Sequence, residues 1–300
     1  MRGLLRKVLG RSRRDGGEEL DPELVGEYRS AYLARAADER VRESGQDGGV
    51  TTALLTHALE EGLVEAAIVA TTGSDPWKPE PIIATSPEEL LEAAGSKYAI
   101  SPNVSLLEEA VSAHESVALV GTPCQITAVR KAERYAHGVA DVAERVRLLV
   151  GIFCSENLEY ENLRRLLREE LGIDPSQVER MDITAGKFTV VTKDGEERTV
   201  PVSRLSQYAN EACHFCTDLT AEDADVSVGS TGAPDGWNVV LTRTDRGEEI
   251  LQSAVDAGRL ETKEVSEGDP KVLERLAQDK RGRISDSRCA TWRPYHPSGP

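Results

Sequence analysis

The chain has 300 residues, of which 52 are Asp or Glu and 36 are Lys or Arg, so its formal net charge is −16. This length allows a full-sized hydrophobic core, and the acidic balance argues against broad binding to nucleic acid. Most of the basic residues are Arg, and an acidic surface poor in Lys indicates a halophilic source, although an ordinary acidic cytosolic protein has a similar composition.

The cysteines and the hydrophobic pattern point to the cytoplasm. The chain has five cysteines, and an odd number in a chain of this size is not typical of a secreted disulfide scaffold. No apolar run approaches the ~18 residues that span a bilayer, and no secretory leader follows the N-terminus. We therefore expect a cytoplasmic protein with reduced thiols.

The first residues differ from the acidic remainder. Residues 1–14 carry only basic charges, and their leucines and valine fall on one helical face. A short basic amphipathic helix can bind an anionic membrane surface or an acidic partner, while a disordered tail would have the same composition. We assign residues 1–20 to a basic tail and residues 1–14 to a candidate peripheral membrane contact.

Helices alternate with strands along the rest of the chain, which is the pattern of an α/β fold. The expected helices cover residues 21–42, 51–61, 87–95, 104–114, 126–134, 160–171, 248–257 and 270–280, and the expected strands cover residues 66–71, 82–84, 117–120, 146–153, 187–192, 198–202, 224–229 and 239–244. The run Val146–Phe153 is almost wholly apolar, which fits a strand buried on both faces of a parallel sheet. We expect a mixed, largely parallel central sheet flanked by helices, with a β-hairpin and loop insertion that carries a C-x-x-C.

Two polar loops interrupt this pattern in the first half of the chain. The loop 43–50 is dense in glycine and precedes a helix, so its backbone N–H groups could bind a phosphate or pyrophosphate. It is not a Rossmann fingerprint, because no strand leads directly into it, and glycine-rich loops are more often simple turns. The loop 95–103 contains Lys97, Tyr98 and Asn103, which is more polar and specific than a spacer needs to be.

Two cysteines follow predicted buried strands. Cys124 follows the strand 117–120 at the start of a helix, and Cys154 follows the apolar run 146–153. Ligands in open α/β sheets bind beyond the carboxyl ends of the strands, so we expect both thiols at one edge of the sheet. Cys213 and Cys216 form a C-x-x-C, which can place two thiolates on one metal or cluster.

Together the four thiols favour a 4Fe–4S cluster over zinc, because a structural zinc site usually pairs two local knuckles. A thioredoxin-type pair is less favoured, because that motif opens a helix directly after a strand. His214 lies between the paired cysteines and is expected to face solvent. Cys289 is expected to be a free thiol in a C-terminal tail, residues 286–300.

Several blocks occur in an order that makes the sequence recognisable. They are residues 45–55, 95–102, 120–125, 151–154, 213–216 and 218–229, followed by Gly236-Trp237. In this order they resemble the coenzyme F420 hydrogenase/dehydrogenase beta-subunit family, over about residues 40–290. The resemblance implies a flavoprotein with FAD and a 4Fe–4S cluster that exchanges hydride with coenzyme F420.

The resemblance also implies which residues hold the cofactors. The cluster ligands would be Cys124, Cys154, Cys213 and Cys216, and the flavin surface would include Gly45, Gln46, Gly48, Gly49, Ser96, Lys97, Tyr98, Thr122 and Gln125. No side chain is expected to act as a catalytic nucleophile, since the protein supplies orientation and potential. Lys97 could stabilise an anionic reduced flavin, the alternative being a surface salt bridge.

A flavoprotein with a single cluster would pass its electrons to an acceptor outside the chain. No additional ferredoxin motif precedes Gly45, so the resemblance implies a redox partner protein or subunit. We expect a flavin-binding region over residues 21–115 and a region with the iron–sulfur site over residues 116–285. Two other functions stay open, a ferredoxin-linked reductase of a small organic substrate within the family and a zinc-stapled binding module without redox activity.

Overall fold

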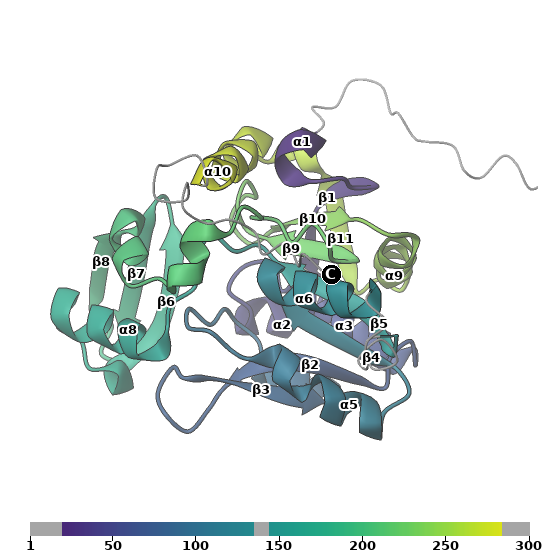
Figure 1. The fold of residues 1–300 in the computed structure, drawn as a ribbon, viewed down its shortest axis with the longest axis horizontal. Coiled ribbons are helices and arrows are strands. Elements are labelled where there is room, and N and C mark those ends of the chain that lie inside the picture. The colour runs from purple at the N-terminus through teal and green to yellow at the C-terminus, as the bar shows by residue number, and fades with distance from the viewer. Residues whose placement is uncertain (1–19, 135–143, 284–300) are drawn as a thin grey trace, which may run out of the picture.

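The computed structural model describes residues 20–134 and 144–283 (Figure 1). Within these ranges the strands are β1 (Ser30–Ala36), β2 (Ala66–Thr72), β3 (Pro79–Ala84), β4 (Val117–Gly121), β5 (Val146–Ile152), β6 (Val178–Thr184), β7 (Lys187–Thr192), β8 (Glu197–Pro201), β9 (Val226–Gly229), β10 (Asn238–Thr242) and β11 (Leu260–Glu264). The α-helices are α1 (Pro22–Val25), α2 (Glu39–Ser44), α3 (Val50–Glu60), α4 (Pro87–Glu92), α5 (Leu107–Ala113), α6 (Pro123–Arg134), α8 (Tyr160–Arg165), α9 (Asp245–Asp256) and α10 (Pro270–Gly282).

Eight of these strands form one mixed sheet in the order β11-β1-β10-β9-β5-β4-β2-β3. The central strands β9, β5, β4 and β2 run parallel, and the strands added on both sides pair antiparallel. Every residue of β4 is buried, because a parallel strand covered on both faces needs a continuous apolar run. The predicted mixed α/β fold with a parallel centre is confirmed.

Helices cover both faces of this sheet and bury two sets of apolar side chains. On one face α3, α4 and α9 pack against the strands, with Leu54 and Leu251 in the same cluster. On the opposite face α5 and α6 pack around Leu119, and α1 and α10 pack around Leu33. The sheet is therefore the middle layer of three.

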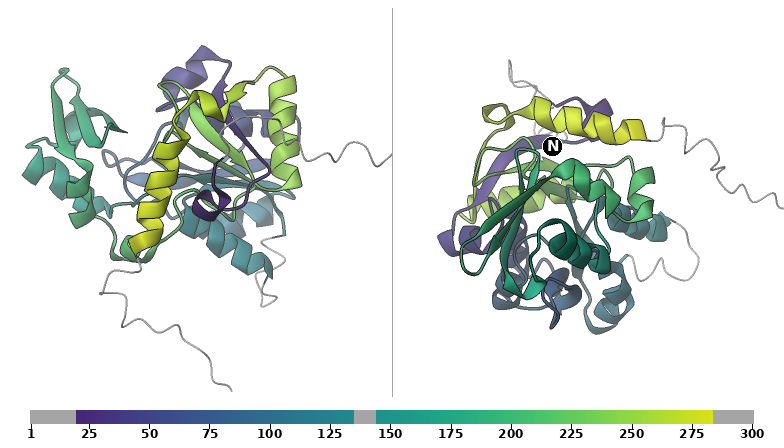
Figure 2. Two further views of the ribbon diagram at one scale, coloured as in Figure 1. Left: turned by 90° about the horizontal axis from the view of Figure 1, so that it is seen from above. Right: turned by 90° about the vertical axis from the view of Figure 1, so that its left-hand side faces the viewer.

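A smaller unit stands beside the main sheet (Figures 1 and 2). It is the antiparallel sheet β6-β7-β8 with α8 packed on it around the fully buried Phe188. The predicted hairpin over residues 187–202 is thus correct but incomplete, because β6 adds a third strand. The loop that leaves β2 contacts this unit, since Trp77 Nε1 donates to Val178 O over 3.3 Å. The smaller unit therefore lies at the carboxyl edge of β2.

The predicted helix over residues 21–42 is wrong. Asp21 does cap a helix, accepting from Glu23 N over 2.9 Å, but that helix ends at Gly26, which has a φ of 78°. Residues Ser30–Ala36 then form β1, which pairs with β10 and β11. Pairing on both sides within the sheet outweighs local helix propensity here. The strands β6 and β11 were not predicted either.

Two sequence-based expectations concern residues outside the described ranges. The candidate membrane contact at residues 1–14 and the thiol of Cys289 both lie there, so both stay predictions. Among the helices that the structure does describe, none is long and apolar enough to cross a bilayer.

One buried carboxylate links the layers. Asp225 is 2% exposed and precedes β9. Its oxygens accept from Leu149 N of β5 over 2.8 Å, from Arg130 of α6 over 2.7 Å and from Thr244 Oγ1 at the start of α9 over 2.7 Å. The carboxylate therefore fixes β5 and α6 relative to each other.

We expect Asp225→Ala to lower the free energy of unfolding by about 2 kcal/mol, because Leu149 N loses its acceptor and Arg130 loses one of two counter-charges while it keeps its ion pair with Glu133. Chemical denaturation measures the loss. The matched control is Asp245→Ala, which removes an ion pair to Arg29 whose carboxylate side chain is 75% exposed and should cost less than about 1 kcal/mol. Equal losses in the two variants would contradict the linking role of Asp225.

Candidate functional site

Two cysteines lie at the carboxyl ends of neighbouring parallel strands. Cys124 is the second residue of α6, directly after β4, and Cys154 is the second residue after β5. Because β4 and β5 pair in parallel, both thiols lie at one edge of the sheet, as the sequence predicts. The hydroxyl of Thr122 is 3.3 Å from Cys124 Sγ.

The turn before α6 is held by its own side chains. Gln125 Oε1 accepts from Thr122 N over 3.1 Å, and Gln125 Nε2 donates to Ser101 O over 2.6 Å. Ser101 belongs to the polar loop 95–103. Thr122 and Gln125 are thus linked to the loop that contains Ser96, Lys97 and Tyr98.

The C-x-x-C comes from a third segment and meets the loop after Cys154. Cys213 lies in the 3₁₀-helix Glu211–Phe215, and Cys216 caps the end of that helix, where the sequence analysis placed a loop. Asn157 N donates to Cys213 Sγ over 3.4 Å, which links the C-x-x-C to the segment that follows β5. His214 is exposed, as expected for a residue that faces solvent.

The four thiols are close enough to change each other's charge equilibria. The pKa of Cys154 is raised to about 12, mainly by burial and also by the thiols of the other three cysteines, while the positive charge of Lys280 lowers it. Burial likewise raises the pKa of Cys213. Cys124 is exposed, and the other three cysteines are partly buried. The four thiols therefore form one cluster, in which the thiol of Cys124 is open to the surface.

The spacing of this set is wider than a single ion requires. In the described part of the chain, no three His, Cys, Asp or Glu side chains are grouped closely enough to hold one metal ion. Zinc with four thiolates at about 2.3 Å brings the sulfurs to within roughly 3.8 Å of each other. The thiols as arranged do not have that compact geometry.

The end of α10 reaches the cysteine loops, which the sequence analysis missed. Lys280 Nζ donates to Cys154 O, and Arg283 Nη1 donates to Ser155 O over 3.0 Å. Lys280 is 2% exposed and lies on the same helix as the buried Leu273 and Ala277. The sequence feature that could have indicated this contact is a lysine at a position of an amphipathic helix where the pattern expects an apolar residue.

The glycine loop packs tightly before α3. A Cβ on Gly48 would lie 2.7 Å from Asn238 Oδ1 and 2.9 Å from Ala34 O, so only glycine fits there. Gly49 has a φ of 69° and precedes α3, whose first turn has no side-chain cap. The N–H groups of that turn are therefore free of intrahelical and capping partners, and a phosphate at such an end is favoured.

Gln46 connects this loop with the smaller unit. Its Nε2 donates to Tyr98 Oη over 2.5 Å and to Asp182 Oδ1 of β6 over 2.7 Å. Burial raises the pKa of Tyr98, so its hydroxyl stays protonated. The glycine loop, the polar loop 95–103 and β6 thus meet at one point.

Lys97 points back onto its own segment. Its Nζ donates to Ala93 O, Ala94 O and Gly95 O over 2.6, 2.8 and 2.9 Å, so it caps the end of α4 and is not the surface salt bridge that was the alternative. Burial lowers its pKa to about 8. Ser96 beside it is exposed.

Asp47 is a titratable group of the glycine loop that the sequence analysis did not single out. Burial raises its pKa to about 6, repulsion from Asp182 and Asp235 raises it as well, and a hydrogen bond with Ser230 lowers it. The loop therefore contains a carboxyl that is partly protonated close to neutral pH.

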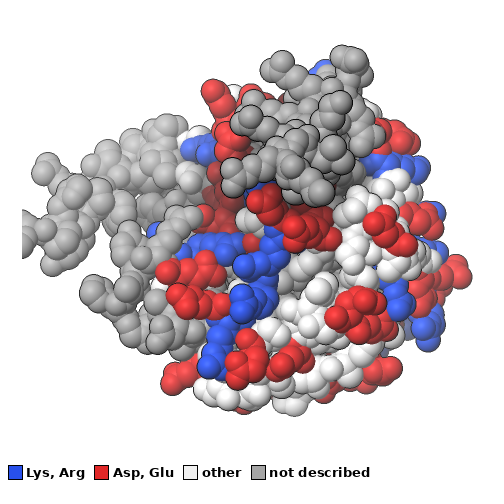
Figure 3. All heavy atoms as spheres, turned by 90° about the vertical axis from the view of Figure 1, so that its right-hand side faces the viewer, with Lys and Arg blue, Asp and Glu red and all other residues white. Residues whose placement is uncertain are grey.

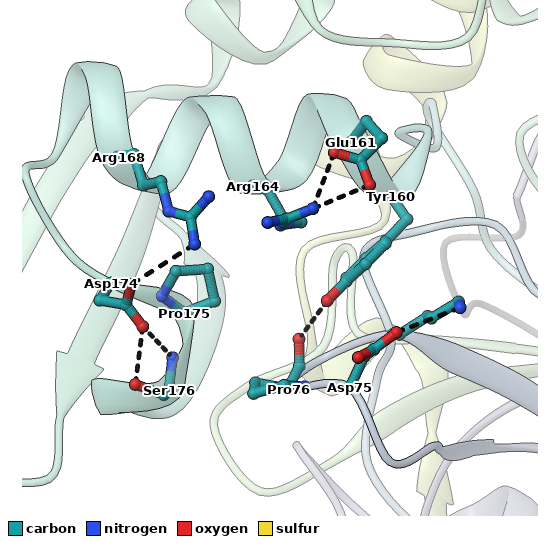
Figure 4. Close-up of a pocket in the computed structure, with 10 residues that line it drawn as sticks. Asp75, Pro76, Tyr160, Glu161, Arg164, Arg168, Asp174, Pro175 and Ser176 are labelled. Carbon is teal, nitrogen blue, oxygen red and sulfur yellow. Dashed lines mark hydrogen bonds and ion pairs between the residues drawn. The ribbon is translucent and has the colours of Figure 1, made fainter.

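A cavity of about 360 Å³ lies where α8 faces the loop after β2 (Figure 4). The cations that line it are each paired with an acid: Arg164 with Glu161, Arg168 with Asp174 and Lys78 with Asp75. The positive charges of this cavity are therefore balanced by neighbouring carboxylates, so the cavity has no net charge that would select an anion.

A second cavity, of about 390 Å³, is lined by Arg147 and Arg246 among other residues. Arg147 is at the start of β5, whereas Cys154 follows its end, so this cavity lies at the edge opposite the thiols. The face near α9 shows a band of Lys and Arg between clusters of Asp and Glu (Figure 3). Neither feature belongs to the cysteine edge.

Comparison with known proteins identifies the family to which the chain belongs. Residues 31–108 match the N-terminal domain, and residues 114–268 the C-terminal domain, described as "Coenzyme F420 hydrogenase/dehydrogenase, beta subunit". The chain belongs to the coenzyme F420 hydrogenase/dehydrogenase beta-subunit family. Of the flavin-surface residues expected from the sequence, Gly45 to Tyr98 fall in the first domain, and all four clustered cysteines fall in the second.

Individual members of this family are similar over most of their length. The chain is 45% identical over 271 residues to "Coenzyme F420 hydrogenase subunit beta" of Methanothermobacter thermautotrophicus, covering 89% of this chain and 96% of that protein. The protein of the same name from Methanosarcina barkeri is 41% identical over 264 residues, with 87% and 90% covered. A chain of the F420-reducing [NiFe] hydrogenase complex from Methanosarcina barkeri superposes with a TM-score of 0.85 at 39% identity, covering 89% of this chain and 93% of that chain.

We expect Asp47→Asn to raise the free energy of unfolding of the protein above pH 6 and to leave it unchanged below pH 4. The fold raises the pKa of this carboxyl from 3.8 to about 6, so its stabilising contribution is complete below pH 3.8 and is lost as the pH rises to about 6. The full shift corresponds to about 3 kcal/mol, and we expect roughly half of it at pH 7.5 because water partly screens the group.

Thermal unfolding at pH 4 and pH 7.5 measures the difference. The exposed Asp279→Asn is the control, since it removes the same charge from a chain of net charge −16. A gain of equal size in both variants would mean that general charge repulsion, and not burial of Asp47, is responsible.

Proposed function

We propose that this chain is an F420-dependent oxidoreductase subunit that moves electrons between coenzyme F420 and a one-electron partner through FAD and a 4Fe–4S cluster. The observation that carries the proposal is the set of four thiols from three segments at the carboxyl edge of β4 and β5. Family membership supports the F420-linked role. FAD, when bound, supplies hydride acceptance with one-electron release, and the cluster supplies one-electron transfer.

The donor set has the residue types that hold a 4Fe–4S cluster. Four cysteine thiolates are the usual ligands of a 4Fe–4S cluster, and a cube of irons and sulfides needs thiols that are spread around it. The sulfurs interact electrostatically, yet no three side chains of the described residues converge as one ion would need. Binding would deprotonate thiols whose pKa values burial now raises.

The flavin would lie against the N-terminal region, residues 21–115, with the cluster in residues 116–285. Gly48 and Gly49 let the loop pack against Asn238 and Val41, and the uncapped first turn of α3 that follows can hold a pyrophosphate. Ser96, Lys97 and Tyr98, with Thr122 and Gln125, would border the ring because their two segments are hydrogen-bonded through Ser101.

The partner would approach where the cluster is nearest the surface. Cys124 is exposed, and Phe215, between the paired cysteines, is 50% exposed. A similar chain belongs to an F420-reducing [NiFe] hydrogenase complex, which supports a second redox subunit as the partner of this one. A cytoplasmic location, membrane contact through residues 1–14 and a halophilic source remain predictions.

Mixing the anaerobically purified protein with reduced coenzyme F420 tests the reaction. We expect the visible flavin band to bleach as hydride is transferred, and the cluster to become reduced afterwards. Bleaching by reduced ferredoxin but not by reduced F420 would favour the alternative reductase of a small organic substrate. A protein that contains zinc, no iron and no flavin would leave only the non-redox binding module.

We expect the double variant Cys213→Ser with Cys216→Ser to lose nearly all of its iron and sulfide while it keeps its flavin, because the thiols and the glycine loop are separate sites. Metal analysis and the flavin absorbance measure the two contents independently. Cys289→Ser is the matched control and should keep both. Full iron content in the double variant would exclude these two cysteines as ligands.

A further inference from the structure

Lys280 is a cation enclosed by the protein next to the cysteine set. It is 2% exposed and follows the buried Leu273 and Ala277 along α10. Its Nζ donates to the carbonyl oxygen of Cys154. An ammonium group in such a place has lost most of its hydration, which is unfavourable unless other charges compensate.

No carboxylate compensates Lys280 in the described part of the chain. Its neighbours on the same helix end do have such partners, since Arg281 pairs with Glu222 over 2.5 Å and Arg283 pairs with Glu156 over 3.9 Å. The hydrogen bond of Lys280 to a neutral carbonyl supplies a dipole and no opposite charge. Lys280 contacts the backbone of Cys154, and Arg283 at the same helix end contacts the backbone of Cys213, so the ammonium lies beside the cysteine set.

We propose that Lys280 is the charge partner of the site that the four cysteines form, and that its ammonium favours the reduced form of the cluster they hold. This inference rests on the proposed function. Reduction adds one electron, supplied by the flavin, and makes the site more negative by one unit charge. A fixed positive charge with little water around it lowers the energy of that added charge more than a surface lysine would.

Lys280 acts through the thiolates and is therefore a positioning and charge-tuning residue. It lies beyond residue 268, where the match to the family's C-terminal domain ends. The helix that carries it also sends Arg283 to the carbonyls of Ser155 and Cys213. One helix end thus holds two of the cysteine segments and delivers the charge to them.

The test compares Lys280→Met, which keeps the shape of the stem and removes the charge, with Lys280→Arg, which keeps the charge. Lys271→Met is the matched control, because it removes the same charge from an exposed position of α10 that lies about 13 Å away along the helix axis. Iron and sulfide per chain are measured first. Anaerobic redox titration followed by electron paramagnetic resonance then gives the reduced fraction of the cluster at each potential.

We expect Lys280→Met to lower the ratio of reduced to oxidised cluster about tenfold or more at a fixed potential, and Lys280→Arg and Lys271→Met to stay close to the wild type. A folded Lys280→Met protein that is poor in iron, with an iron-replete Lys280→Arg protein, also supports the charge role. An unchanged ratio in Lys280→Met overturns the inference, as does an equal defect in Lys280→Arg. Wild-type protein without iron and sulfide overturns the proposed function itself, which distinguishes the two failures.

Discussion

The geometry of the site depends on the buried carboxylate of Asp225. It ties Leu149 of β5 to Arg130 of α6 and to the start of α9. The two elements it joins are the ones that position Cys124 and Cys154, because one cysteine opens α6 and the other follows β5. This carboxylate therefore ties together the two elements that carry these thiols, and a packed interior transmits small displacements between them.

The edge itself is built from three parts that are distant in the sequence. The strand ends supply two thiols, the segment before β9 supplies the C-x-x-C, and α10 supplies Lys280 from the opposite direction. On the other side of the edge, Gln46 joins the glycine loop to Asp182 of the smaller unit. The candidate cofactor surfaces thus lie between rigid elements, which is where precise positioning is least costly.

Much of this could be predicted from the sequence, and the failures have identifiable causes. The apolar runs before Cys124 and Cys154 predicted buried strands of a parallel sheet, because few other arrangements bury such strands on both faces, whereas their pairing as neighbours is known only from the structure. β1 was mistaken for a helix because its pairing with β10 and β11 comes from residues far along the chain. The contacts of Lys280 with Cys154 and of Gln46 with Asp182 depend on packing between elements, which no local pattern encodes.

The separation of the cysteines along the chain also bears on the order of assembly. Before the sheet forms, the chain offers only the local pair Cys213 and Cys216, because Cys124 and Cys154 come into range only when β4 and β5 are paired. Small zinc domains fold around their metal, whereas here the buried core of the main sheet must exist first. A cluster held by all four cysteines, as proposed, would therefore be added to a sheet that has already formed.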